Sequence, residues 1–198
     1  MLYSMSSEDI DTRTRILEAT WQLLEQHQGQ GVKMSDIAKA VGISRQAVYL
    51  HFASRTELMI ATMNYVDEVK GLYERLNQLQ SAQSGAESID TLVEIWGNYI
   101  PEIYGLAKAM LMTKDSDDAM AAAWNNVMGC LRDVCQQTIE MLAQEGKLAA
   151  AWSIDEATDM FVTVVSIPNW EQLNKECHWS NEQYINSIKT LLKRTFVA

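Results

Sequence analysis

The stretch DIAKAVGISRQAVYLHF, residues 36–52, decides how this chain folds. Its pattern predicts two short helices, over about 34–41 and 45–52, with a turn between them. Gly42 stands where the first helix needs a left-handed residue to end. Ser44 stands where a hydroxyl can cap the second helix. The sequence therefore predicts a helix-turn-helix.

A small apolar core explains the other residue types in this stretch. Ile43 lies inside the turn, and we expect it to be buried because that would fix the angle between the helices. Its expected partners are Ile37, Val48 and Phe52. Ala38 is small, so the second helix can cross close above it. The outer side of the second helix would then be free to enter the major groove of DNA.

The flanking segments extend this unit in both directions. A helix is predicted from about Asp11 or Thr12 to His27, and the glycines at 29 and 31 end it. Its expected buried stripe is Ile16, Ala19, Leu23 and Leu24. On the other side, Ser54 and Glu57 have the spacing of a capping box, which opens a helix expected to run to about Gln80.

The remaining residues indicate a loop followed by longer helices. Residues 81–88 are small and polar, which is typical of a loop. Helices are expected at about 88–112, 116–146, 154–174 and 181–196. Pro101 and Pro168 fall inside two of these helices and are expected to kink them.

Composition favours an all-α protein. The 198 residues are 47 % hydrophobic and include 2 prolines, 9 glycines and 11 methionines, which suits long helices around a sizeable core. We expect a three-helix DNA-binding domain with the helix-turn-helix over residues 1–58. A larger helical domain for effector binding and dimerisation is expected over residues 59–198.

Net charge at first argues against nucleic acid, because the chain carries −10. The distribution changes this interpretation: residues 12–55 carry +3 and the rest of the chain carries −13. A basic end on an acidic body is typical of a DNA-reading module joined to a larger domain. Chance segregation of charge is the alternative.

No segment predicts a membrane span, an enzyme or a bound cofactor. The longest apolar candidate, residues 160–165, falls far short of the roughly 20 residues that a membrane helix needs. Residues 1–11 include acids and no basic start, so we expect no secretory signal. The three cysteines lack metal-type spacing and suit a reduced cytoplasm. The histidines are scattered, and no nucleophile, base or metal set is visible.

The quoted stretch, continued to Met59, closely resembles the DNA-binding half of the TetR family of regulators. The preceding segment RILEATWQLL resembles the first helix of that half, and the strong match covers about residues 12–60. The resemblance implies that Arg45 and Gln46 touch base edges, for which Arg suits guanine and Gln suits adenine. Leu50 occupies another position that can face the groove.

The resemblance also implies contacts with backbone phosphates. The residues concerned on and beyond the second helix are Ser44, Tyr49, His51 and Arg55. Lys33 and Ser35, at the start of the preceding helix, would add further contacts. Family members often have Thr where this chain has Lys33, which cannot cap a helix. We therefore expect Ser35 to cap instead and to shift the helix start.

Three of these positions have a simpler interpretation. Tyr49 would be a partly buried packing residue, His51 a solvated surface histidine, and Leu50 merely exposed. Ile37, Ile43, Val48 and Phe52 are core residues for which no DNA contact is expected.

Residues 60–198 offer aromatic and methionine side chains at helical spacing. Candidates for binding a ligand are Trp96, Tyr99, Ile103, Met110, Trp124, Met128, Phe161 and Trp170. Such stripes are more often plain core. The resemblance nevertheless implies a pocket for a small apolar or aromatic effector. Glu94 or Glu102 would suit a cationic ligand, although a solvated face is the simpler interpretation.

The C-terminal stretch resembles the tail of one subset of the family, in Trp179, Ser180, Glu182 and Tyr184. Ser180 is expected to cap the last helix. The expected apolar stripe of that helix is Ile185, Ile188, Leu191, Leu192 and Phe196. The resemblance implies that the last two helices of each subunit form a four-helix dimer bundle. A homodimer on a palindromic double-stranded operator would follow.

Two hypotheses about control result. In the first, a dimeric repressor is released from DNA by a small-molecule effector. In the second, a DNA-binding factor of this fold is controlled by a protein partner and has no effector pocket.

Overall fold

The computed structural model describes the backbone of residues 7–198 and the side chains of residues 11–198. The expectation about a secretory signal falls largely on residues outside this range. The all-α prediction is confirmed, since the chain is 79 % helical. Within the described part, β pairing is limited to the isolated bridge between Leu148 and Val197.

The described part of the chain divides into two compact units. The first contains the residues up to Val69 and Gly105–Val127, and the second contains Lys70–Tyr104 and Met128–Ala198. The long helices α6 (Gly85–Thr113) and α7 (Asp118–Gln144) each contribute to both units.

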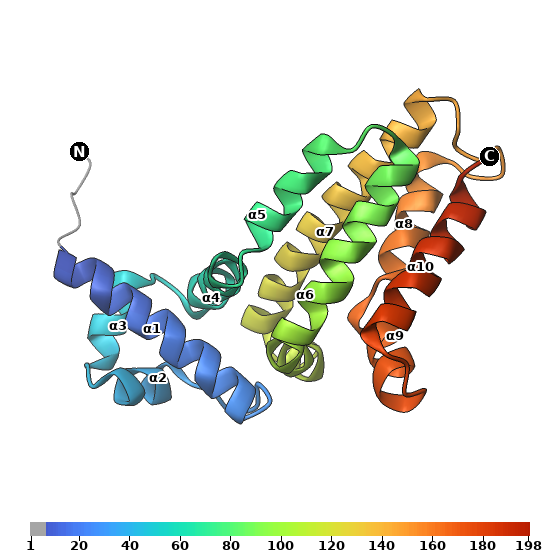
Figure 1. The fold of residues 1–198 in the computed structure, drawn as a ribbon. Helices are drawn as coiled ribbons and strands as arrows, with labels where there is room; N and C mark the ends of the chain where they lie inside the picture. Colours follow the sequence, from blue (N-terminus) through green and yellow to red (C-terminus); the bar gives the residue numbers. More distant parts are fainter. Residues whose placement is uncertain (1–6) are drawn as a thin grey trace. The chain divides into compact units, whose positions relative to one another are not determined.

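The first unit is built on four N-terminal helices (Figure 1). They are α1 (Ser7–Gln26), α2 (Met34–Val41), α3 (Arg45–His51) and α4 (Arg55–Val69). Helix α1 packs against both α2 and α4, and α2 packs against α3. The side chains of Ile16, Leu24, Ile37, Val48, Phe52, Leu58 and Met59 are 0 % exposed. Ala19 and Leu23 of the predicted stripe are half-buried.

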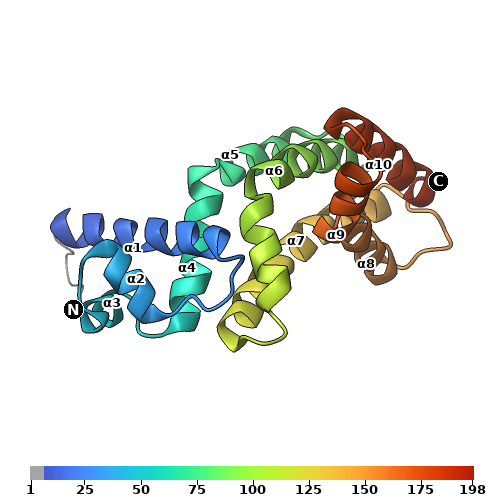
Figure 2. The same cartoon turned by 90° about the horizontal axis from the view of Figure 1, so that it is seen from below.

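The second unit contains the C-terminal helices. Its elements besides α6 and α7 are α5 (Leu72–Leu76), a 3-10 turn (Asn77–Ser81), α8 (Ile154–Val164), α9 (Ile167–Glu171), a π-helical turn (Gln172–Glu176) and α10 (Asn181–Phe196). Helix α10 runs alongside α6 (Figure 2), and a hydrogen bond from Lys193 to Asp90 joins the two helices.

Several predicted helix limits are wrong. Helix α1 begins at Ser7 and not at Asp11. The helix expected to reach Gln80 stops at Val69, because Gly71 adopts a left-handed φ of 67° and starts α5. The helix expected over 154–174 stops at Val164, and Pro168 lies in the first turn of the next helix. Helix α6, in contrast, continues through Pro101.

The loop expected over 81–88 is shorter in the structure, because α6 begins at Gly85. Ser84 Oγ accepts a hydrogen bond from the Glu87 N–H at 3.2 Å. The Glu87 carboxylate accepts one from the Gln83 N–H at 2.7 Å. These two hydrogen bonds satisfy backbone N–H groups at the start of α6 that have no partner within the helix.

Candidate functional site

Helix α3 is held by its own caps and by two buried side chains. Ser44 Oγ accepts a hydrogen bond from the Ala47 N–H at 3.0 Å, so the predicted cap is confirmed. Gly42 ends α2 with a left-handed φ of 77°, as predicted. Val48 and Phe52 are fully buried. Ile43, expected to be buried in the turn, is only half-buried.

The opposite side of α3 faces solvent. Arg45, Gln46, Tyr49 and Leu50 are all exposed. Leu50 is 88 % exposed, an unusual position for a large apolar side chain, and Tyr49 is 38 % exposed. Because Val48 and Phe52 fix the rotation of the helix, these four side chains form one outward surface.

Arg45 and Tyr49 are in contact on this surface. The Arg45 guanidinium lies 5.5 Å from the centre of the Tyr49 ring. Its Nη2 is 3.4 Å from the Tyr49 hydroxyl, to which it donates a hydrogen bond. One helical turn separates the two residues, which is the spacing at which side chains meet on a helix. The contact limits the freedom of the Arg45 side chain.

His51, the last residue of α3, is less exposed than the four residues of the outward surface. Its side chain is half-buried. Its carbonyl oxygen accepts a hydrogen bond from Arg13 at 3.2 Å, and the Arg13 guanidinium lies 4.1 Å from the centre of the Phe52 ring. His51 thus lies at an anchored end of the helix.

The start of α2 differs from the prediction. The helix begins at Met34, with Lys33 in extended conformation as the capping residue, so Ser35 does not cap it. The Asp36 carboxylate accepts a hydrogen bond from the Lys33 N–H at 3.0 Å. An ammonium group has no lone pair with which to accept the reciprocal bond. The helix start is therefore not shifted, and Lys33 and Ser35 are both exposed there.

Three arginines of the first unit bind protein carbonyls, which sequence reasoning missed. Arg15 donates a hydrogen bond to the Val41 carbonyl at 2.7 Å, and Arg13 donates to His51. Each satisfies an otherwise unpaired carbonyl at the end of a helix. Arg55 donates to the Val32 carbonyl at 3.1 Å and forms an ion pair with Asp117 at 2.5 Å.

Some basic side chains of residues 12–55 bind groups within the protein, and others face solvent. Arg13, Arg15 and Arg55 hold the unit together, and Arg55 has only a quarter of its side chain exposed. Lys33, Lys39 and Arg45 are exposed and form no ion pair with any described residue. The exposed basic side chains of this stretch that have neither an ion pair nor a carbonyl partner therefore lie on or next to α2 and α3.

Most of the residues predicted to bind a ligand are buried. Trp96, Tyr99, Ile103, Met110, Phe161 and Trp170 are each at most 9 % exposed, whereas Trp124 and Met128 are half-buried. Trp96 donates its indole N–H to the Val165 carbonyl at 2.8 Å, and its ring lies 5.8 Å from that of Tyr99. Met110 and Trp124 belong to the first unit and the others to the second.

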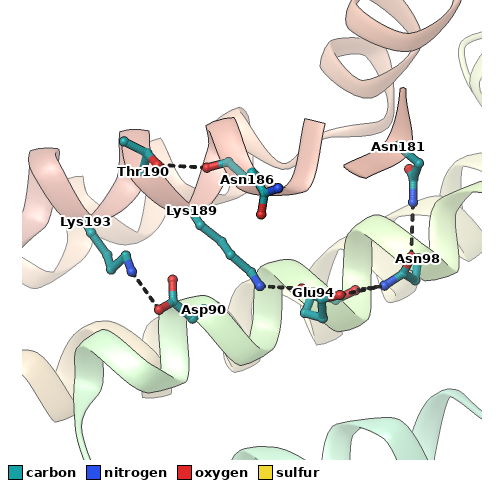
Figure 3. A network of polar contacts seen from close by, with 8 residues as sticks. All are labelled: Asp90, Glu94, Asn98, Asn181, Asn186, Lys189, Thr190 and Lys193. Atoms are coloured by element: carbon teal, nitrogen blue, oxygen red, sulfur yellow. Dashed lines mark hydrogen bonds and ion pairs between the residues drawn. The ribbon is translucent and has the colours of Figure 1, made fainter. Parts of the chain in front are cut away.

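Polar residues join α6 to α10 along one side of each helix (Figure 3). Lys193 donates to Asp90 at 2.6 Å, and Lys189 pairs with Glu94. One turn further along α6, Asn98 accepts a hydrogen bond from the Asn181 side-chain amide at 3.1 Å. Glu94 thus pairs with a lysine of this chain, and Glu102 pairs with Arg75 at 2.7 Å.

Close packing accompanies these polar contacts. A Cβ atom at Gly97 would lie 2.5 Å from Cγ1 of Ile185, so only glycine allows α10 to approach α6 this closely. The stripe predicted for α10 is buried at Ile185, Ile188, Leu192 and Phe196, but Leu191 is 48 % exposed. Ser180 caps α10 as predicted, accepting from the Gln183 N–H at 3.1 Å.

The described residues contain no group of three or more His, Cys, Asp or Glu side chains placed to hold a metal ion. No helix among them combines the length and apolar character of a membrane span.

Helix α3 follows a capped turn, buries its inner side and presents arginine, glutamine and tyrosine to solvent. This arrangement defines the helix-turn-helix class of DNA-binding domain. The family described as bacterial regulatory proteins, tetR family, matches residues 16–62. That range covers α2, α3 and about half of α1 and of α4. Residues 16–62 are therefore similar to the DNA-binding part of tetR-family regulators.

Relatives at the sequence level include a nucleoid occlusion factor SlmA from Marinomonas sp. (strain MWYL1). It is 34 % identical over 93 residues, which make up 45 % of this chain and 46 % of that protein. A SlmA from Aliivibrio fischeri (strain MJ11) is 26 % identical over 100 residues, which are 50 % of each chain. This chain thus matches about half the length of these relatives.

Solved structures match over nearly the whole chain. A putative transcriptional regulator from Saccharomonospora viridis, in complex with choline, has a TM-score of 0.73 at 16 % identity, covering 95 % of this chain and 98 % of that one. FadR from Bacillus subtilis, in complex with stearoyl-CoA, has a TM-score of 0.73 at 15 % identity, covering 92 % and 98 %. At these identities the likeness shows a shared fold.

Proposed function

We propose that this protein is a dimeric, sequence-specific DNA-binding regulator that reads a palindromic operator with the outward side of α3. The observation that carries the proposal is the exposed set Arg45, Gln46, Tyr49 and Leu50 on a helix whose inner side is fully buried. Arg45 and Gln46 are suited to hydrogen bonds with guanine and adenine. Leu50 is suited to an apolar contact with a thymine methyl group.

Phosphate contacts would position this helix in the groove. Exposed Ser44 and Tyr49 flank the base-reading residues, and Lys33 and Ser35 lie exposed at the start of α2. His51 and Arg55 complete the proposed set, with smaller contributions because one is half-buried and the other is paired with Asp117. A location in the cytoplasm follows from access to bacterial chromosomal DNA.

The experiment that tests DNA reading is selection of bound sequences from a random double-stranded pool. We expect an inverted repeat, because a two-fold dimer presents two recognition helices. Arg45→Ala or Gln46→Ala should then weaken binding to the selected site by about 1–3 kcal/mol and relax the base preference. Gln137→Ala, an exposed glutamine on α7, is the matched control. Unchanged affinity in both α3 variants would exclude this surface as the reader.

Dimer formation is proposed through α8 and α10. The two helices pack together, and each leaves a large apolar side chain exposed: Met160 is 41 % exposed and Leu191 is 48 % exposed. Leu191→Glu should shift the protein from dimer to monomer in sedimentation velocity experiments, with its far-ultraviolet circular dichroism unchanged. A monomeric parent protein at micromolar concentration would contradict the proposal.

For control, we propose repression released by a small effector held among the aromatic residues of the C-terminal helices. Within the second unit, the candidate lining residues are Trp96, Tyr99, Ile103, Met128, Phe161 and Trp170. Structural neighbours of the same fold hold choline in one case and stearoyl-CoA in another, so the fold accommodates small molecules of different polarity. A thermal-shift screen, followed by DNA-binding measurements with each hit, tests this proposal.

A second candidate is control by a protein partner. The observation that favours it is the similarity to nucleoid occlusion factors, which extends over 93 residues and so beyond the DNA-binding domain. In this case no small molecule from the screen would stabilise the protein or weaken its binding to DNA.

A further inference from the structure

A lysine of this chain lies over two aromatic rings at the C-terminal end of α9. The rings of Tyr104, on α6, and Trp170, on α9, have centres 5.2 Å apart and are tilted by 48°. The Lys175 ammonium lies 5.4 Å from the centre of each ring. Two electron-rich faces thus converge on one positive charge, which is the arrangement that recognises organic cations.

Both rings are held in place by hydrogen bonds of their own. The Tyr104 hydroxyl donates to the Glu171 carboxylate at 2.7 Å. The Trp170 indole N–H donates to the Asn181 side-chain oxygen at 3.3 Å, and Trp170 is 3 % exposed. The ring pair therefore does not depend on Lys175 for its position. The Glu171 carboxylate adds negative charge at its edge.

Lys175, in contrast, is an exposed residue that can leave this position. Its ammonium forms no ion pair with any described residue. It belongs to the π-helical turn Gln172–Glu176, a type of turn that is rare and often lies at functional sites. A change of side-chain rotamer takes the ammonium away from the two rings without any change in the backbone.

The chemistry favours a methylated ammonium over the lysine that now lies there. A lysine ammonium is strongly hydrated and keeps its hydrogen bonds only by facing water. A quaternary ammonium has no N–H groups to satisfy, and its methyl groups gain from contact with the rings. We propose that Tyr104 and Trp170 form a binding site for a quaternary ammonium ligand, with Lys175 as the built-in cation that the ligand displaces.

The inference rests on the proposed role of the C-terminal helices in effector binding, but its test is separate from DNA binding. Isothermal titration of the full chain with tetramethylammonium chloride, at constant ionic strength, should show saturable binding. Tert-butanol, which is similar in size and uncharged, should not bind. Equal responses to the two probes, or no response to tetramethylammonium, would overturn the site while leaving the DNA selection experiment unaffected.

Variants of Lys175 test whether this lysine competes with the ligand for the two rings. Lys175→Ala removes the competitor and should tighten tetramethylammonium binding by about 2- to 5-fold, the size of one exposed cation–π contact. Lys175→Arg keeps a cation and should not tighten it. Glu176→Ala, in the same turn, controls for a general loosening of the segment. Weaker binding in Lys175→Ala would show that the lysine supports the ligand and would contradict displacement.

Variants of Tyr104 separate its ring from its hydroxyl. Tyr104→Leu removes one aromatic face and should weaken binding at least about 5-fold, since one of the two cation–π contacts is lost. Tyr104→Phe keeps the face and loses only the bond to Glu171, so it should bind nearly as well as the parent protein. Circular dichroism and thermal unfolding of both variants check that the helices remain folded. Equal affinity of Tyr104→Leu and the parent protein would exclude the site.

Discussion

The helix pairs α2–α3 and α6–α10 are held together by different kinds of contact. Between α2 and α3 the joint is a capped turn sealed by Ile37, Val48 and Phe52, all 0 % exposed. Between α6 and α10 a close approach at Gly97 is flanked by ion pairs at the protein surface. The contact between α2 and α3 is mainly apolar, whereas the ion pairs between α6 and α10 are screened by ions in solution. The position of α3 thus depends on buried apolar side chains, whereas part of the contact between α6 and α10 responds to ionic strength.

The strongest test of this contrast is Phe52→Ala. It removes a fully buried ring and the contact of that ring with Arg13, and should lower the free energy of unfolding by about 3–5 kcal/mol. Leu50→Ala, two residues away and 88 % exposed, should change it by less than about 0.5 kcal/mol. Chemical denaturation followed by circular dichroism measures both. Similar decreases in the free energy of unfolding of the two variants would show that burial of Phe52 does not stabilise this unit.

Gly97→Ala tests the close approach in the other joint. The added Cβ would lie 2.5 Å from Ile185, and forcing the helices apart should cost about 1–3 kcal/mol. Gly129→Ala is the matched control, since a Cβ at this helical glycine meets no atom within 4 Å. That variant should gain up to about 1 kcal/mol from better helix propensity. A stabilised Gly97→Ala protein would mean that α10 does not need its close position on α6.

Serine caps occur in both regions and allow a direct comparison of function. Ser44→Ala and Ser180→Ala each remove a hydroxyl that accepts from the backbone, and each should cost about 1 kcal/mol of stability. We expect Ser44→Ala alone to weaken DNA binding in an anisotropy titration beyond its effect on stability. If Ser180→Ala weakened DNA binding equally, the loss would have to come from dimer assembly and not from a phosphate contact at Ser44.

The smallest expected effect concerns the ion pair between Lys193 and Asp90, whose side chains are 39 % and 35 % exposed. Asp90→Asn should cost at most about 1 kcal/mol at low salt, and the difference should shrink as salt is added. Asp133→Asn, at an exposed α7 carboxylate with no ion pair among the described residues, provides the baseline. Thermal unfolding at low and high salt measures the two variants. A penalty that does not depend on salt would place the role of Asp90 in packing.

The end of α2 and the starts of α3 and α10 could be predicted because the residues that set them are adjacent in sequence. Gly42, Ser44 and Ser180 act on backbone groups within a few residues. The break after Val69 was missed, although Gly71 marks it, because the helical pattern continues on both sides. The start of α6 was also missed, although Ser84 and Glu87 have capping-box spacing.

The outward side of α3 was predictable for a similar reason. Once Val48 and Phe52 are identified as buried, helical periodicity requires that Arg45, Gln46, Tyr49 and Leu50 point away. The roles of the arginines were not predictable. Arg13 and Arg15 donate to carbonyls 38 and 26 residues away, and Arg55 pairs with Asp117, 62 residues away. No local pattern carries such information.

The use of these arginines as carbonyl donors has a consequence for how the protein would search a chromosome. Binding to arbitrary DNA is driven by release of condensed counterions, and each neutralised phosphate contributes about −0.9 to the slope of log affinity against log salt. With Arg13, Arg15 and Arg55 committed within the unit and a net charge of −10, few cations remain for this purpose. We therefore expect a smaller slope of log affinity against log salt than the count of basic residues in 12–55 suggests.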